Sequence, residues 1–145
     1  MKTHAAVVLT LVLASPGAAT AADGARIFAD TCQACHQAGG VGAPGLAPPL
    51  VSPVIANAAA KQKDYPVLVV INGLSGSIAL AAGGTIASAM PPQQGLGDDE
   101  VAAVVNYVFR LNHAKTVLKS ADVAQVRGQP TSHDALKQIR SGLLP

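Results

Sequence analysis

The sequence has few aromatic and few charged residues. Phe, Trp and Tyr make up 3% of its 145 residues, Trp is absent, and charged residues make up 12% with a formal net charge of +2. Nucleic-acid-binding chains usually carry a clustered basic face, so this weak charge bias argues against that class. Aromatic side chains usually fill much of a small core, and their scarcity suggests that something other than side chains fills part of this one.

The N-terminal residues have the pattern of a secretory signal peptide. Lys2 supplies a positive charge, residues 5–14 form an apolar run, and Ala19-Thr20-Ala21 offers a small-x-small cleavage site. We expect residues 1–21 to be removed on export to the periplasm. Because a membrane span needs about 18 or more apolar residues, we expect no span after cleavage, and an uncleaved anchor is the alternative.

The chain contains only two cysteines, Cys32 and Cys35, both in the segment TCQACHQ at residues 31–37. A thiol-disulfide oxidoreductase places such a pair at the start of a helix that follows a strand. Here Asp23 can cap a helix that runs into the cysteines, and Gly39-Gly40 ends the region. The pair therefore lies at the wrong end of a helix for that class, which stays open as an alternative.

Two metal chemistries also use this motif. A zinc site needs about four ligands, and besides the motif only His113 and His133 remain after removal of the first 21 residues. Covalent haem attachment needs two thiols at positions i and i+3 and an imidazole directly after them, which Cys32, Cys35 and His36 supply. The motif favours one covalently bound haem c with His36 as an axial ligand.

The sixth position of the haem iron has one methionine candidate in the mature chain. Met90 precedes Pro91-Pro92, which restrict the backbone beside it, and we expect it in a loop rather than as a core filler. A thioether opposite an imidazole raises the reduction potential, which suits electron transfer. His113 or His133 as sixth ligand is the alternative.

The chain resembles the class I c-type cytochromes, and within them the small bacterial monohaem domains that occur alone or as subunits of periplasmic dehydrogenases. The resemblance runs from about residue 24 to 111 through GARIFADTCQACH, PGLAPPL, VINGLSGSI, AMPP and DDEVAAVVNYV. It implies a mostly α cytochrome c fold of about four to five helices around one haem. It also implies that the carbonyl of Pro48 accepts the Nδ1 proton of His36.

The helix after Gly97 has the clearest periodicity, with an apolar stripe at Val101, Val104, Val105, Val108 and Phe109. By resemblance, Gly24 and Phe28 of the first helix pack against Val104 and Tyr107. Asp64 can cap a shorter helix that ends at Gly73. Alternation around Ile78 and Leu80, then Gly83-Gly84, Thr85 and Ile86, predicts a small β-hairpin before the Met90 loop.

Apolar side chains are expected to enclose the haem in place of an aromatic core. Those we expect around it, besides the valine stripe, are Ile27, Leu46, Leu50, Leu68, Ile71, Leu74 and Ile78. Lys61, Lys63 or Tyr65 are candidates to reach the haem propionates.

Charged residues are rare around the expected haem edge. Between residues 33 and 97 they are Lys61, Lys63 and Asp64. We expect a redox protein partner, a dehydrogenase or an oxidase, to meet the exposed haem edge through a weak apolar contact at residues 41–46 and 90–92. The alternative is that these residues are merely buried in loops.

The sequence divides into a signal peptide at residues 1–21, a cytochrome c domain at 22–112 and a helical extension at 113–145. In the extension, Ser120 opens one helical pattern and Ser132 can cap a second. The extension either packs on the domain or contacts a partner subunit. We predict a periplasmic electron carrier that is not an enzyme. The alternatives are an electron-accepting subunit of a periplasmic dehydrogenase and a thiol-disulfide oxidoreductase.

Overall fold

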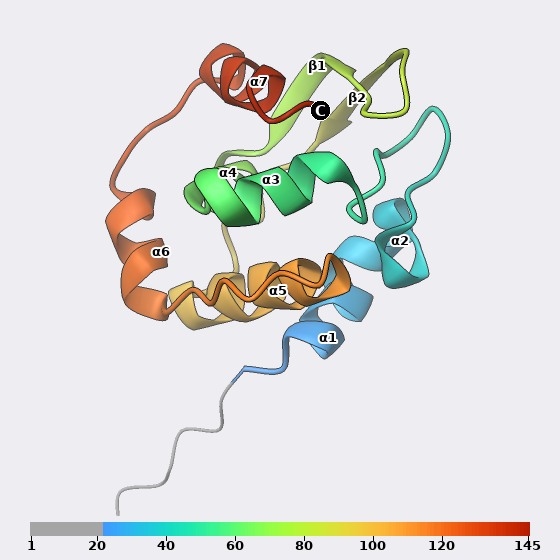
Figure 1. The fold of residues 1–145 in the computed structure, drawn as a ribbon. Helices are drawn as coiled ribbons and strands as arrows, with labels where there is room; N and C mark the ends of the chain where they lie inside the picture. Colours follow the sequence, from blue (N-terminus) through green and yellow to red (C-terminus); the bar gives the residue numbers. More distant parts are fainter. Residues whose placement is uncertain (1–21) are drawn as a thin grey trace, which may run out of the picture.

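The computed structural model describes residues 22–145, and the expected signal peptide lies outside the described residues. The architecture is mostly helical with one small antiparallel sheet (Figure 1). In chain order the elements are α1 (Gly24–Ile27), the π-helical turn η1 (Phe28–Cys32), α2 (Gln33–His36), the 3₁₀ turn η2 (Ala38–Gly40), α3 (Pro53–Lys61), α4 (Asp64–Asn72), β1 (Leu74–Ala79), β2 (Thr85–Met90), α5 (Asp98–Leu111), α6 (Ser120–Arg127) and α7 (His133–Ser141).

The first helical run extends from residue 24 to 36 through α1, η1 and α2. Asp23 caps it, because its Oδ1 accepts hydrogen bonds from the backbone N–H groups of Ala25 at 3.0 Å and Arg26 at 3.3 Å. The run ends at Gln37, whose φ is +61°. As predicted, the two cysteines lie at the C-terminal end of this run. The π turn just before them was not predicted, since nothing in the local pattern distinguishes it from α-helix.

Helix α5 packs directly across α1. Its apolar stripe is buried as predicted, and the carboxylate of Glu100 accepts the N–H of Gly97 at 2.9 Å, which is the half of a capping box that the third helical residue supplies. A Cβ at Gly24 would lie 2.0 Å from the carbonyl oxygen of Ala103. The two backbones therefore touch at a position that only glycine allows. Phe28 and Tyr107 also meet, with ring centroids 5.2 Å apart.

The hairpin is longer than predicted. Strands β1 and β2 pair from Leu74 with Met90 to Ala79 with Thr85, and Gly83 and Gly84 in the turn have φ of +91° and +78°. Met90 is therefore the last residue of a strand and not part of a loop, which corrects the expectation above. The many Ser, Ala and Gly residues of both strands have low or neutral β-propensity, so the sequence pattern concealed the strand ends.

Two helices separate the first run from the hairpin. Helix α3 begins after Ser52, whose Oγ accepts the N–H of Ile55 at 3.4 Å, and it was not anticipated. Helix α4 starts at Asp64, so this residue is the first of the helix and not its cap. The connecting loop before α3 is tied to the end of α5, because Asn112 donates to the Leu50 carbonyl at 2.8 Å and accepts from the Ser52 N–H at 2.9 Å.

Residues 113–145 pack onto the rest of the protein. Val123, Val126, Leu136 and Leu143 join the same buried cluster as α3, α4 and α5. Two ion pairs fasten α6, Lys63 with Asp122 at 2.5 Å and Arg127 with Asp98 at 2.6 Å. Helix α7 lies against β1 and α4 (Figure 1). Within residues 22–145, no helix has both the length and the apolar character needed to cross a membrane.

Truncation of Leu136 should show how strongly this segment is attached. The side chain is fully buried, so we expect Leu136→Ala to lower the free energy of unfolding by about 2–5 kcal/mol through lost contacts and an unfilled cavity. Val117→Ala is the matched control, because Val117 is 71% exposed and its truncation should change stability by less than about 0.5 kcal/mol. Denaturant unfolding of the haem-loaded proteins measures both. Equal stabilities of the two variants would mean that the segment does not pack as described.

Candidate functional site

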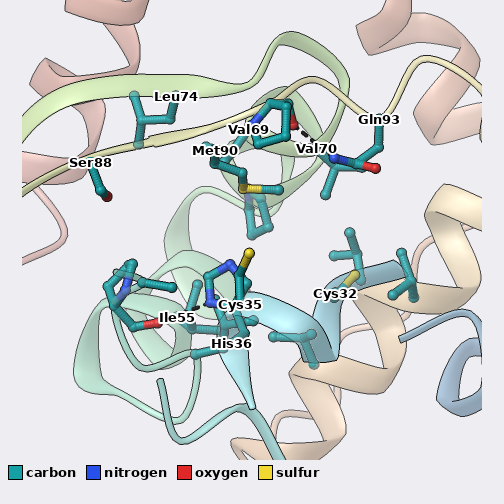
Figure 2. Close-up of a pocket in the computed structure, with 18 of the residues that line it drawn as sticks. Cys32, Cys35, His36, Ile55, Val69, Val70, Leu74, Ser88, Met90 and Gln93 are labelled. Atoms are coloured by element: carbon teal, nitrogen blue, oxygen red, sulfur yellow. Dashed lines mark hydrogen bonds between the residues drawn. The ribbon is translucent and has the colours of Figure 1, made fainter. Parts of the chain in front are cut away.

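One cavity gathers the chemically distinctive residues of the chain. Helix α2, the loop before α3, helix α4, the hairpin, helix α5 and helix α7 all contribute to its walls, which are mainly apolar. Figure 2 shows Cys35 and His36 entering the cavity from one side and Met90 from the other, with Cys32 farther along the same helical run as His36. The four residues singled out by the sequence are thus brought to one space.

The two thiols lie on the wall formed by the first helical run. Cys32 ends the π turn and Cys35 lies in α2, and both are free in the structure. Burial, with the neighbouring Cys35 thiol, raises the pKa of Cys32 to about 11. Redox-active thiols instead sit where their pKa is lowered. This environment does not support the thiol-disulfide alternative.

His36 is buried and oriented by one hydrogen bond. Its Nδ1 lies 3.0 Å from the carbonyl oxygen of Pro48, and because a carbonyl only accepts, Nδ1 must carry the proton. Burial lowers the pKa of His36 and the bond to Pro48 partly opposes this, so the ring is neutral at pH 7. The Nε2 lone pair is then free to bind a metal ion.

The Pro48 carbonyl is itself held by a close backbone contact. Gly42 has a φ of +79°, and its N–H donates to the His36 carbonyl at 2.8 Å. A Cβ at Gly42 would lie 2.8 Å from the carbonyl carbon of Pro48. The glycine-rich loop therefore wraps tightly around His36, which is its structural role.

Met90 reaches the cavity from the end of β2. It pairs with Leu74 in the sheet, and Gly73, with a φ of +71°, lies so close that a Cβ there would be 2.6 Å from the Met90 carbonyl oxygen. The next turn is anchored by the Gln93 N–H, which donates to the Val70 carbonyl at 2.8 Å. Neither His113 nor His133, the alternative sixth ligands, lines the cavity. The Nδ1 of His133 instead lies 2.6 Å from the Ser75 hydroxyl.

The apolar wall differs in part from the expected one. Leu46, Leu50, Leu74 and Ile78 line the cavity, as do Val104, Val105 and Val108 of the α5 stripe. Ile27, Leu68 and Ile71 are buried in the core instead. In α4 it is Val69 and Val70 that line the cavity in place of Leu68 and Ile71, together with Tyr65 and Pro66. This helix is apolar on nearly all sides, so its periodicity did not reveal which face meets the cavity.

The polar groups at the cavity were only partly anticipated. Tyr65 lines it and is buried, whereas Lys61 is exposed and Lys63 pairs with Asp122. Arg140 of α7 also lines the cavity and was missed. Arg140 lies four residues after the buried Leu136, so both are on the same face of α7. This spacing is the sequence feature that could have indicated a buried position for Arg140.

A haem is compatible with this donor set. Two thiols and a neutral imidazole lie on one wall, and a thioether lies on the opposite wall. The remaining side chains are mainly apolar, as a covalently attached porphyrin requires. For zinc, the part of the chain that the structure describes contains no group of three or more His, Cys, Asp or Glu side chains placed to hold a metal ion.

Comparison with known proteins agrees with this arrangement. The family model described as Cytochrome c matches residues 21–112. Two proteins named cytochrome c-552, both from Thermus thermophilus, are 37% identical to this chain over 123 residues. The alignments cover 83% of this chain, with 86% of one relative and 76% of the other.

The contact between Gly73 and Met90 can be tested by substitution. In Gly73→Ala the new methyl group would clash with the Met90 carbonyl and the left-handed φ would be strained, so we expect the haem-loaded protein to lose about 1–3 kcal/mol of unfolding free energy. Gly83→Ala is the matched control, because its φ is also positive at +91° but no atom lies within 4 Å of the added carbon. If both variants unfold at the same denaturant concentration, the close contact is not present in solution.

Proposed function

The chain belongs to the cytochrome c family, and on that basis we propose that it carries single electrons in the periplasm with His36 and Met90 as the axial ligands of its haem. Members of this family bind haem c covalently and transfer electrons without catalysing a substrate reaction. The haem supplies a one-electron ferric/ferrous couple. We assign its covalent attachment to Cys32 and Cys35.

The observation that supports the ligand assignment is the meeting of His36 and Met90 at one cavity. They come from α2 and from β2, 54 residues apart in the sequence, and approach the cavity from opposite sides (Figure 2). The carbonyl of Pro48 holds the proton on Nδ1, which leaves Nε2 as the ligand atom. A thioether opposite an imidazole favours the ferrous state and a higher potential.

The surrounding residues exclude water and limit rearrangement. Ile55, Val69, Val70 and Leu74 make the walls apolar, which keeps the dielectric constant around the iron low. The Gly42 and Gly73 contacts hold the segments that bear Pro48 and Met90. Such close contacts suit a carrier, because they would limit the reorganisation that accompanies each electron transfer.

A periplasmic location is supported by the N-terminal pattern of Lys2, the apolar run and the Ala19-Thr20-Ala21 site. We take residues 22–112 as the haem-binding domain, close to the 21–112 match of the family model. Residues 113–145 form a helical extension packed on it.

We further propose that the redox partner meets a neutral, apolar rim. Val41 is 65% exposed and Leu46, which also lines the cavity, is 50% exposed. Pro91 and Pro92, which follow Met90, are exposed as well. No charged residue occurs in 37–60 or 65–97 of the sequence. Such a surface fits the small, weak contacts of redox proteins.

Replacement of Met90 tests the ligand pair. We expect Met90→Ala to retain covalent haem, which resists acidified acetone extraction, and to lose the far-red sulfur-to-iron absorption band of the ferric protein. His133→Ala and His113→Ala are the controls, and both should keep the band. A wild-type protein without this band, or one in which a histidine variant alters the axial ligand, would contradict the assignment.

The dependence of electron-transfer rate on salt tests the neutral rim. Oxidation of the ferrous protein by hexacyanoferrate(III) in a stopped-flow instrument should slow only weakly as ionic strength rises. Leu46→Lys, which places a cation on the rim, should raise the low-salt rate a few-fold and steepen the decline. If the wild-type rate falls as steeply as that of the variant, the rim is charged and the proposal is wrong.

A further inference from the structure

Arg140 is a buried charge that the site described so far does not explain. Among residues 22–145, His36 and Arg140 are the only polar or charged residues classed as buried, and Arg140 is 8% exposed. Burial of a guanidinium is costly unless an anion and hydrogen bonds compensate for the lost water. The identity of its counter-charge is therefore the question.

The protein provides hydrogen bonds for Arg140 but no anion. Its Nε and Nη2 donate to the Ala79 carbonyl at 3.3 and 3.2 Å. Burial raises the pKa of the nearby Tyr65 hydroxyl, and the positive charge of Arg140 partly opposes this rise. The ion pairs within residues 22–145 are Lys63 with Asp122, Arg127 with Asp98, and Lys137 with Asp134. Residues 1–21 contain no Asp or Glu, so no acidic side chain of this chain pairs with Arg140.

Arg140 faces the cavity that we assign to the haem. Arg140 and Tyr65 both line this cavity, and the lining includes no lysine and no acidic residue. Arg140 is thus the only permanently charged side chain at the cavity. A single fixed cation in an otherwise apolar space favours an anionic group of whatever fills it.

The position of α7 indicates which part of the haem would supply this anion. Helix α7 lies beside β1 at the upper left of Figure 1, whereas α2, which bears Cys35, lies apart from it at the right. In a haem the two vinyl groups that form thioethers occupy one part of the porphyrin edge, and the two propionates occupy another. Attachment at Cys32 and Cys35 therefore directs the carboxylates away from α2.

We propose that Arg140 binds a propionate carboxylate of the haem. This inference rests on the haem site proposed above. The guanidinium is held at its Nε edge by Ala79, and no hydrogen bond within residues 22–145 uses Nη1, which remains to donate to a carboxylate. The extension at residues 113–145, outside the matched family region, thereby becomes part of the cofactor site.

This role has an electrostatic consequence. A cation paired with the propionate cancels part of the negative charge near the iron, and so favours the ferrous over the ferric state. Arg140 is on this account a positioning residue that also raises the reduction potential, and it acts through the carboxylate without contacting the iron. The potential is a quantity that a purely structural residue would not be expected to shift in a defined direction.

Two substitutions in the haem-loaded full chain test the proposal, with one matched control. Arg140→Gln removes the charge and Arg140→Lys keeps it without the planar fork. Arg127→Gln is the control, because it removes the same charge from the same extension, while Arg127 pairs with Asp98 and does not line the cavity. Measurements are the midpoint potential by spectroelectrochemistry and the propionate bending band in the resonance Raman spectrum, which responds to hydrogen bonding of the carboxylate.

We expect Arg140→Gln to lower the ferrous-to-ferric ratio at a fixed ambient potential by on the order of tenfold, which for one electron corresponds to a fall of about 59 mV. The propionate band should shift in both Arg140 variants, and the potential should fall less in Arg140→Lys. Arg127→Gln should alter neither. If Arg140→Gln does not accumulate with haem, the band in Arg140→Lys decides.

An unchanged band together with an unchanged potential in the Arg140 variants would overturn the proposal, as would equal shifts in Arg127→Gln. The far-red absorption band separates this failure from failure of the haem site itself. A wild-type protein that has the band while the Arg140 variants show no shift would leave His36 and Met90 ligation intact. A wild-type protein without the band would contradict the ligand assignment instead.

Discussion

Enclosure of one large apolar ring system is the constraint on which the rest of this structure depends. The chain has 3% aromatic residues, yet it places apolar side chains of α4, α5 and the hairpin around a single cavity. A bound ring would cover the faces of these side chains that line the cavity, and each Å² of apolar surface removed from water contributes roughly 25 cal/mol. The cofactor of this family therefore stabilises the fold as well as carrying the electron.

The backbone holds this cavity open at a few points of close contact. Gly24 lets α1 touch α5, and Gly42 and Gly73 bring the segments of Pro48 and Met90 against their neighbours. These contacts fix the wall that bears His36 and the wall that bears Met90. The C-terminal extension completes the enclosure with Leu136 in the core and Arg140 at the cavity. Arg140, the only buried charged residue of the extension, thus lies at a cavity that has no other permanently charged side chain.

The sequence predicted features that depend on the spacing of nearby residues. It did not predict all the features that depend on tertiary packing. The motif at Cys32, the α5 stripe and the cap at Ser132 follow from short-range rules and agree with the structure. Helix α3 was missed, and Met90 ends a strand because strand pairing with Leu74 prevails over a weak local preference. Leu68 and Ile71 face the core while Val69 and Val70 face the cavity, since α4 is apolar on both sides.

The sequence alone determined the chemical identity of the candidate site, because Cys32, Cys35 and His36 are neighbours along one helical run and need no long-range contact to form a haem-attachment motif. It also determined the family, the mostly helical class and Met90 as the candidate sulfur. Only the tertiary structure decided which residues surround that motif. Met90, Pro48 and Arg140 are 54, 12 and 104 residues from His36 in the sequence, and they reach the same cavity only when the hairpin, the glycine-rich loop and α7 have packed. Local sequence patterns do not reveal contacts between residues that are far apart in the sequence, because such contacts depend on how whole helices and strands pack against one another.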